Sequence, residues 1–425
     1  MDIISTEFFA LYLVTAVLFF FFNRRIEVLI VSILIFLWSY SPLIIVSVIL
    51  ISFLSYAVLL RQNRFTKTIG ITAISVCLLI PRIFGFNLIS EPIVFFGLSY
   101  YGLQAISLIA RSKIKSIRFT EVFFAFSNPL TITSGPIQPV QKLSNSLNRT
   151  GLSKERQFFT AIKYVLWGVA IKKGLSDLLY TYFIQSTYFE GSTSNVNTLP
   201  LIIITGFYIF FDFYAYSKLV VGLALLIDIE LIDNFDDPYS NINPKAFWKN
   251  WHISFSEWLK EYIYIPIGGK RRLRFFGLSL AAFCTFLVSA IWHGFTLNFL
   301  VWGGMHFFLF SFATNTKSSK FYHFIIFYFV TFYAWVIFLA PNWSVGISII
   351  KGSFANWVWD PVFILISLLL IPTYLFIVRF FKYWTTHSHQ TKATTIIDFL
   401  MFMVLICVIL LFGGVESKSF LYFNF

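Results

Sequence analysis

The sequence predicts an all-α, polytopic membrane protein. Of its 425 residues 58% are hydrophobic and only 12% are charged, more apolar surface than a soluble core of this length can absorb. The run IEVLIVSILIFLWSYSPLIIVSVILISFLSYAVLL over 26–60 is long enough for two membrane-crossing helices. The apolar stretch 8–22 is followed by NRR and then by further spans, so we interpret it as a retained helix and not as a cleaved signal peptide.

The apolar segments have lengths near the ~20 residues that a bilayer requires. The basic loops NRR, RQNRFTK and RSKIKSIR are separated by two segments each time, so all three can face the cytoplasm. We therefore expect residues 1–425 to form a single integral membrane domain with about eleven to twelve spanning helices. The segments are 6–22, 26–42, 43–60, 69–85, 92–110, 160–185, 199–229, 275–293, 298–314, 321–340, 361–380 and 396–413.

Two segments depart from a plain spanning helix. Residues 119–140 contain SNPLTITSGPIQP, which is rich in Pro, Ser, Thr and Gly, and the loop count requires them to enter the membrane and return. Irregular backbone at membrane depth is tolerated only inside protein or beside a cavity, so we predict a re-entrant segment. The run 199–229 is interrupted by Asp212 and fits either one kinked helix or two short ones.

The net charge of +13 does not by itself identify the partner of the protein. Lys and Arg lie in short loops, where they set topology and contact membrane lipids, and we expect no nucleic-acid partner. Cys77, Cys284 and Cys407 lie inside apolar segments with no metal-binding spacing, and neither an HExxH motif nor a paired-carboxylate motif is present. We therefore expect no bound metal.

Residues 230–274 form the one long polar stretch, and we expect this segment to be cytoplasmic or interfacial. Its centre, 247–262, has the period of an amphipathic helix that starts at Asn243-Pro244 and stops near Gly268. His252 falls at the edge of the apolar face and points toward the helix bundle. The apolar face comprises Phe247, Trp248, Trp251, Phe255, Trp258, Leu259 and Tyr262, and the polar face Lys249, Asn250, Glu257, Lys260 and Glu261.

Three histidines are candidates for function. His293 lies at the end of the apolar run LSLAAFCTFLVSAIW, where an ionisable ring is costly unless it faces a cavity or a partner. The following Gly294 allows close approach by a ligand or a neighbouring helix. A packed His293 and an interfacial His252 that binds a headgroup or a carbonyl remain open alternatives. We expect a structural role for His306, because Gly303 and Gly304 beside it indicate close helix packing.

The sequence FWKNWHISFSEWLKEYIYIPIGGKR, followed some forty residues later by SAIWHG, resembles the signature of the membrane-bound O-acyltransferases. The likeness is to the bacterial alginate and peptidoglycan O-acetyltransferase branch. SGPIQP, YSNINP and the terminal ESKSFLYFNF also resemble this branch.

The resemblance implies that His293 is catalytic and that His252 lies in a cytoplasm-facing funnel of the same site. It also implies a ring of spanning helices around a thin central tunnel, in the inner (cytoplasmic) membrane of a bacterium. The acyl donor would enter from the cytoplasm.

The chemistry of acyl transfer suggests roles for further residues. A hydroxyl nucleophile needs a base at neutral pH, and imidazole suits this task. Trp251, Trp258 and Trp292 are bulky enough to narrow a tunnel around an extended donor. Asn298 could orient a carbonyl or the histidine ring, with a plain loop role as the alternative. Lys270, Arg271 and Arg272 could steer an anionic donor or, equally, anchor the protein to lipid.

These observations predict an O-acyltransferase that moves an acetyl group from a cytoplasmic thioester donor to an extracytoplasmic polysaccharide. Acetyl-CoA or another acyl thioester is the expected donor, and peptidoglycan, alginate or a similar glycan the acceptor. We expect a separate periplasmic or membrane partner protein to complete transfer. D-alanyl transfer to teichoic acid is one alternative. Another is a transporter of acyl groups or lipid-linked sugars; it would usually show matched broken helices in two halves, and the sequence lacks them.

Overall fold

The computed structural model describes fourteen stretches of the chain, within which the protein is almost entirely helical. Two two-residue strands, β1 (Arg274–Phe275) and β2 (Leu278–Ser279), pair antiparallel. The predicted all-α class is therefore confirmed for the described residues. The described residues are 5–21, 25–61, 63–84, 97–111, 117–147, 154–190, 198–241, 243–268, 274–275, 278–315, 321–355, 360–387, 392–415 and 419–421.

The chain divides into two compact units, which are described separately. The first contains residues 1–165 and 220–233, and the second contains residues 166–219 and 234–421. The prediction of a single domain over 1–425 stays a prediction.

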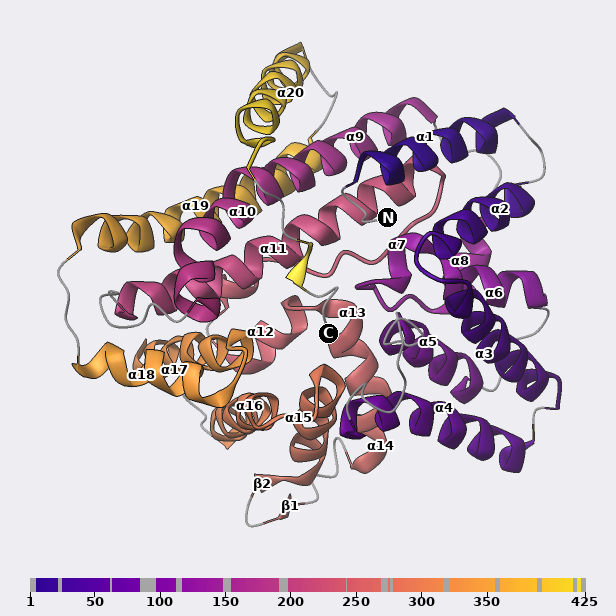
Figure 1. Ribbon diagram of the computed structural model, residues 1–425, viewed down its shortest axis with the longest axis horizontal. Coiled ribbons are helices and arrows are strands. Elements are labelled where there is room, and N and C mark those ends of the chain that lie inside the picture. The colour runs from indigo at the N-terminus through magenta and orange to yellow at the C-terminus, as the bar shows by residue number, and fades with distance from the viewer. Residues whose placement is uncertain are drawn as a thin grey trace. The chain divides into compact units, whose positions relative to one another are not determined.

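In the first unit, helices that follow one another in the chain pack side by side, as α1 to α5 do (Figure 1). Helix α6 packs against α2 and α3. The helices are α1 (Thr6–Phe21), α2 (Arg25–Trp38), α3 (Pro42–Arg61), α4 (Arg64–Phe84), α5 (Leu98–Ala110), α6 (Phe119–Ser127), α7 (Pro129–Ile132), α8 (Val140–Leu147) and the start of α9 (Lys154–Ile171).

The segment that we predicted to be re-entrant contains two short helices, α6 and α7, followed by irregular buried backbone that leads to α8. Asn128 caps α7, with its side chain accepting a hydrogen bond from the Leu130 amide at 3.0 Å, and Pro129 occupies the first helical position. Residues 130–138 are all buried. This burial satisfies the condition for irregular backbone within a membrane, although the re-entrant placement itself stays a prediction.

In the second unit, α15, α16, α17 and α18 pack in sequence order (Figure 1). The long helix α11 (Thr198–Leu226), whose residues 198–219 belong to this unit, is continuous through Asp212, so the apolar run on either side of Asp212 forms one helix and not two. The other helices are α10 (Asp177–Leu179), α12 (Pro244–Asn250), α13 (Ile253–Leu259), α14 (Ile265–Ile267), α15 (Leu280–His293), α16 (Leu297–Asn315), α17 (Phe321–Leu339), α18 (Trp343–Ala355), α19 (Pro361–Thr386) and α20 (Lys392–Phe412). Lys172–Ser176, Tyr180–Phe189 and Lys260–Tyr264 are π-helical.

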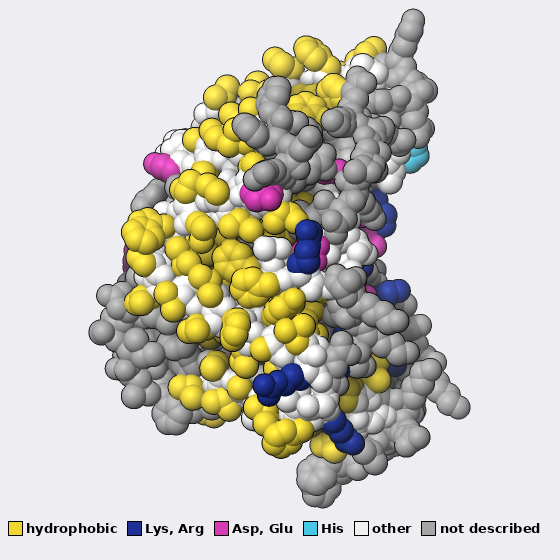
Figure 2. Space-filling model, turned by 90° about the vertical axis from the view of Figure 1, so that its right-hand side faces the viewer, with side chains coloured by type: hydrophobic (Ala, Val, Ile, Leu, Met, Phe, Trp, Pro, Cys, Tyr) yellow, Lys and Arg dark blue, Asp and Glu magenta, His cyan; other side chains and the backbone are white. Residues whose placement is uncertain are grey.

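Apolar helices long enough to cross a membrane occur in both units. Among the described residues, four helical stretches meet this condition by length and composition: Pro42–Arg61, Thr198–Leu226, Pro361–Thr386 and Thr394–Phe412. Six shorter apolar helices accompany them. Figure 2 shows one face on which hydrophobic side chains predominate and charged ones are few. Helix α3 illustrates this exposure, because Leu43, Val46, Ile49, Leu50 and Phe53 all point outward.

Candidate functional site

His252 lies at a break between two short helices. We predicted one helix over 247–262, and this prediction is wrong, because α12 ends at Asn250 and α13 begins at Ile253. His252 itself has a left-handed backbone, with φ 45°, which a non-glycine residue adopts only when its surroundings fix it. The predicted start at Asn243-Pro244 is confirmed, since the Asn243 side chain accepts a hydrogen bond from the Ala246 amide at 2.9 Å.

A polar segment after α11 holds this break in place. The Ile253 amide donates to the carbonyl of Asn234 at 3.0 Å, and the Ser254 amide donates to the Asn234 side chain at 3.2 Å. The Asn234 amide in turn donates to the Ser217 hydroxyl of α11 at 3.0 Å. Sequence reasoning missed Asn234 and Ser217, although the polar run NFDDPYSN after a long apolar helix marks a segment with side chains free for capping.

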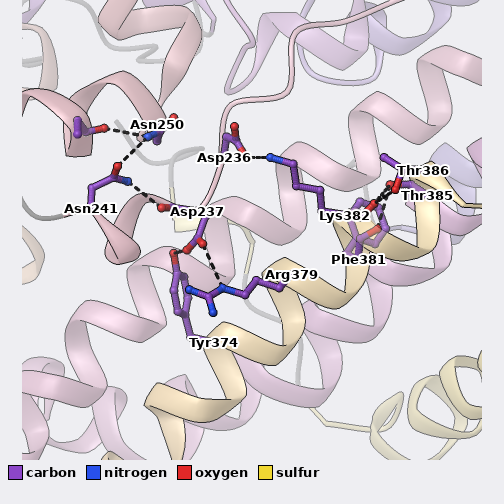
Figure 3. Close-up of polar contacts among 11 residues, drawn as sticks. Asp236, Asp237, Asn241, Asn250, Tyr374, Arg379, Phe381, Lys382, Thr385 and Thr386 are labelled. Carbon is purple, nitrogen blue, oxygen red and sulfur yellow. Dashed lines mark hydrogen bonds and ion pairs between the residues drawn. The ribbon is translucent and has the colours of Figure 1, made fainter.

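Hydrogen bonds and ion pairs connect the same segment to α19 (Figure 3). The Tyr374 hydroxyl donates to Asp237 Oδ1 at 2.7 Å and accepts a hydrogen bond from the Tyr239 amide at 2.9 Å. Arg379 Nε lies 3.5 Å from Asp237 Oδ2, and Lys382 Nζ lies 2.9 Å from Asp236 Oδ1. The backbone that carries His252 is thus held from both α11 and α19.

Burial determines the charge state of His252. The side chain is 2% exposed, and its ring contacts Phe213 of α11 at 4.7 Å between centroids. Removal from water disfavours the imidazolium form, and this desolvation lowers the pKa of His252 from its ordinary value of 6.5 to about 3. The ring is therefore neutral at physiological pH and can accept a hydrogen bond.

His293 ends α15 and lies against the first turns of α16. The side chain is 6% exposed. Its ring stacks on Phe299 with centroids 5.8 Å apart, and a Cβ atom on Gly294 would come within 2.8 Å of that phenyl ring. Gly294 thus allows the close approach of a neighbouring helix that the sequence suggested. Further ring contacts are made with Trp292, Trp302, Phe338 and Phe255, at 4.7, 5.3, 4.9 and 6.2 Å.

Two shared aromatic rings join the histidines. Phe255 and Trp292 stack on each other with centroids 4.2 Å apart. Both rings contact His252, at 5.2 and 6.1 Å, and both contact His293. The structure therefore brings the two predicted histidines to one aromatic site, from α15 and from the break before α13.

The predicted tryptophans separate into two groups. Trp292 lies between the histidines, whereas Trp251 packs against Phe235 and, at 4.7 Å, against Trp335 of α17. Trp258 is buried and contacts Tyr262 one turn later, at 5.2 Å. The burial pattern predicted for 247–262 holds at these positions even though the helix is broken.

Of the polar residues predicted to bind substrate, Asn298 is the one that the structure describes. Asn298 lies in the first turn of α16 and not in a loop, and its amide nitrogen donates to the carbonyls of Ile337 and Ala340 at 3.1 and 2.8 Å. It thereby ties α16 to the end of α17, and its role toward substrate stays a prediction. Lys270, Arg271 and Arg272 lie outside the described residues.

A buried cluster of charges was not anticipated from the sequence. Lys172 Nζ lies 2.8 Å from Asp212 Oδ1 and 2.9 Å from Asp177 Oδ1. The Ser176 hydroxyl and the Leu421 amide donate to the two Asp212 oxygens, at 2.8 and 2.7 Å. We call Lys172, Ser176, Asp177 and Asp212 the ion-pair cluster. In the sequence, the ion-pair cluster was indicated only by Asp212, which interrupts an apolar run.

Residues suited to hold a metal are not grouped in the part of the chain that the structure describes. No three histidine, cysteine or carboxylate side chains come together there.

Comparison with known proteins shows the family to which the chain belongs. The sequence profile of the MBOAT, membrane-bound O-acyltransferase family, matches residues 110–350, which include both histidines. The chain belongs to this family of membrane proteins, as the two histidine motifs suggested.

The relatives carry three different names. The chain is 30% identical over 251 residues to a peptidoglycan O-acetyltransferase of Helicobacter pylori, covering 52% of this chain and 47% of the relative. It is 26% identical over 273 residues to a probable alginate O-acetylase AlgI of Pseudomonas putida, covering 61% and 56%. A teichoic acid D-alanyltransferase of Bacillus subtilis is 26% identical over 235 residues, covering 52% and 58%. The chain thus spans about half the length of the curated relatives it matches.

Proposed function

We propose that the chain is an O-acyltransferase that moves an acetyl group from a cytoplasmic thioester, acetyl-CoA, to an extracytoplasmic polysaccharide such as peptidoglycan or alginate. The observation that carries this proposal is the aromatic site in which His252 and His293 contact the same two rings, Phe255 and Trp292. The family match over these residues and the names of the Helicobacter and Pseudomonas relatives support acetyl as the group transferred.

His293 is the proposed general base. Its imidazole nitrogen takes the proton of the acceptor hydroxyl while the hydroxyl oxygen attacks the thioester carbonyl carbon. The new carbon–oxygen bond forms, the carbon–sulfur bond breaks, and the proton passes from the imidazolium ring to the departing thiolate. A base of this kind contributes about 10²–10⁴-fold to rate.

The other predicted residues act on binding in this proposal. His252, neutral and buried, is a hydrogen-bond partner for donor or acceptor within the cytoplasm-facing part of the site. Trp251, Trp258 and Trp292 shape the passage around the donor. Lys270, Arg271 and Arg272 attract its phosphates or anchor the chain to lipid.

The architecture proposed is a ring of about eleven to twelve spanning helices around a thin tunnel, in the bacterial cytoplasmic membrane. Because five aromatic rings enclose His293, the passage for the donor has to open between those side chains. A separate periplasmic or membrane protein is proposed to complete delivery to the glycan.

D-alanyl transfer is the second candidate, and it rests on the 26% identity with the Bacillus D-alanyltransferase. A donor comparison separates the two candidates. Membranes that contain the full chain and consume acetyl-CoA but not a D-alanyl thioester favour acetyl transfer, and the reverse result favours D-alanyl transfer.

The central test compares His293→Ala with His387→Ala in membranes supplied with radiolabelled acetyl-CoA. His387 is an exposed histidine after α19, so its replacement controls for loss of an imidazole elsewhere. Label incorporated into cell-wall polysaccharide should fall at least a hundredfold for His293→Ala and stay within twofold for His387→Ala. Equal incorporation by the two variants overturns the role of His293. Label that crosses the membrane without any ester being formed indicates the transporter alternative.

A further inference from the structure

His306 lies at the centre of a second group of buried polar rings. The residue belongs to α16 and is 0% exposed. Its ring contacts three indoles, those of Trp248, Trp302 and Trp335, with centroids 4.9, 5.2 and 5.9 Å away. These indoles come from α12, α16 and α17. We call the four residues the His306 cluster.

The nitrogens of this cluster have no hydrogen-bond partner in the described protein. This holds for both ring nitrogens of His306 and for the indole nitrogens of Trp248, Trp302 and Trp335, all of which are buried. A buried polar atom without a partner is costly, and native proteins rarely leave one in that state. Five together in one cluster are difficult to explain by packing alone, because phenyl rings would fill the same space without that cost.

Counting donors and acceptors defines what would satisfy the cluster. Each indole is a donor only, and a neutral imidazole has one donor and one acceptor. The cluster therefore offers four donors and one acceptor, so at least three donors remain even if one indole bonded to His306. A fourth ring, that of Phe286, lies 6.2 Å from His306 and is apolar, so the surroundings favour an uncharged group with an acceptor oxygen.

The cluster lies next to the proposed catalytic histidine. Trp302 contacts His306 at 5.2 Å and His293 at 5.3 Å, so a single indole separates the two imidazoles. A carbonyl group held by the Trp302 indole would thus lie at a ring that contacts His293.

We propose that the His306 cluster binds the carbonyl oxygen of the acyl thioester through its indole and imidazole N–H groups. This inference rests on the proposed function, because it assumes a thioester donor. When the acceptor oxygen attacks the carbonyl carbon, negative charge moves onto the carbonyl oxygen. Donors already placed at that oxygen stabilise the charge. His306 would then contact substrate directly and share the transfer step with His293.

Two inert donor analogues test this inference with the full-length chain in vesicles. The ketone analogue of acetyl-CoA, with a methylene in place of sulfur, keeps the carbonyl oxygen, whereas ethyl-CoA, a thioether, lacks it. The native chain should bind the ketone about tenfold more tightly than ethyl-CoA, the effect of one buried hydrogen bond. His306→Leu should abolish that preference, and His306→Gln, which retains an N–H donor, should restore part of it.

Trp302→Phe and Trp384→Phe supply a matched pair. Trp302 has an indole nitrogen without a protein partner, whereas that of Trp384 donates to Asp398 at 2.6 Å. Only Trp302→Phe should reduce the preference for the ketone, and it serves as the second variant if His306→Leu fails to fold.

Each other outcome has a definite meaning. An unchanged preference in His306→Leu and Trp302→Phe, equal weakening of both analogues, or no preference in the native chain overturns the inference alone. Binding of neither analogue by the native chain overturns the thioester donor itself, and the inference with it.

Discussion

The ion-pair cluster and the His306 cluster are both buried and polar, but they differ in how their atoms are satisfied. In the ion-pair cluster, Lys172 is within 2.9 Å of two carboxylates, and Asp212 accepts further hydrogen bonds from Ser176 and Leu421. In the His306 cluster, five nitrogens have no partner among the described residues. The charges of the first region pair with one another, whereas we infer that a ligand completes the second region.

This difference distinguishes buried polar groups that stabilise the fold from buried polar groups that bind a ligand. Charges that pair with one another hold helices together, and removing one partner leaves a buried charge that is not compensated. Polar atoms that nothing in the protein satisfies do not stabilise the fold, and their retention indicates a ligand. Four substitutions test this distinction, from the largest expected change in stability to the smallest.

Lys172→Met should cause the largest loss of stability. It leaves Asp212 buried without its cation and leaves Asp177 with the more distant Lys173, whose Nζ lies 3.7 Å from Asp177 Oδ2. Breaking a buried pair in this way costs about 3–5 kcal/mol of unfolding free energy. Lys382→Met is the control, because the Lys382–Asp236 pair is exposed and worth about 0–1 kcal/mol. Denaturant unfolding in detergent measures both, and equal values would remove the contrast on which the comparison depends.

His252→Gln should change how stability depends on pH. The pKa of His252 is about 3 in the folded protein and about 6.5 in the unfolded chain, so between pH 6.5 and 3 the unfolded chain takes up a proton that the folded protein does not. Stability therefore falls as pH falls. From pH 6.5 to 5 this group should cost about 2 kcal/mol, and the variant should lack that component. Parallel pH profiles for the native chain and the variant would show that His252 is not held neutral by burial.

Tyr374→Phe should have an intermediate effect. The variant removes the hydroxyl that donates to Asp237 and accepts a hydrogen bond from the Tyr239 amide, at a cost of about 1.5 kcal/mol. Because this segment precedes His252, acetyl transfer should decline as well. Tyr383→Phe, an exposed tyrosine on the same helix, is the control. A Tyr374→Phe chain with native stability would mean that α19 does not hold the segment.

His306→Leu should have the smallest effect on stability and a large one on activity. Replacing an unsatisfied polar ring by an apolar side chain of similar size should leave the unfolding free energy within about 1 kcal/mol, or raise it. Transfer of the acetyl group should fall at least tenfold, the consequence of losing one hydrogen bond to the reacting carbonyl. A loss of stability as large as that of Lys172→Met would mean that the His306 cluster stabilises the fold and does not bind a ligand.

Several features were predictable because they depend on local patterns. The apolar runs predicted helices, and Asn243-Pro244 predicted the start of α12 because a capping side chain and a proline act within one turn. The alternation of apolar and polar residues over 247–262 predicted which side chains are buried. It could not predict the break at His252, because hydrogen bonds to Asn234, 18 positions away, impose that backbone.

By itself, the sequence determined the helical, membrane-spanning class and the two histidine motifs, because composition and short spacing are sufficient for both. The tertiary structure alone decided which polar residues meet. It joined His252 to His293 through Phe255 and Trp292, paired Lys172 with Asp212, and surrounded His306 with indoles from three helices. The reason is physical: whether a buried polar atom is satisfied depends on distances between helices, and no local pattern in the chain encodes them.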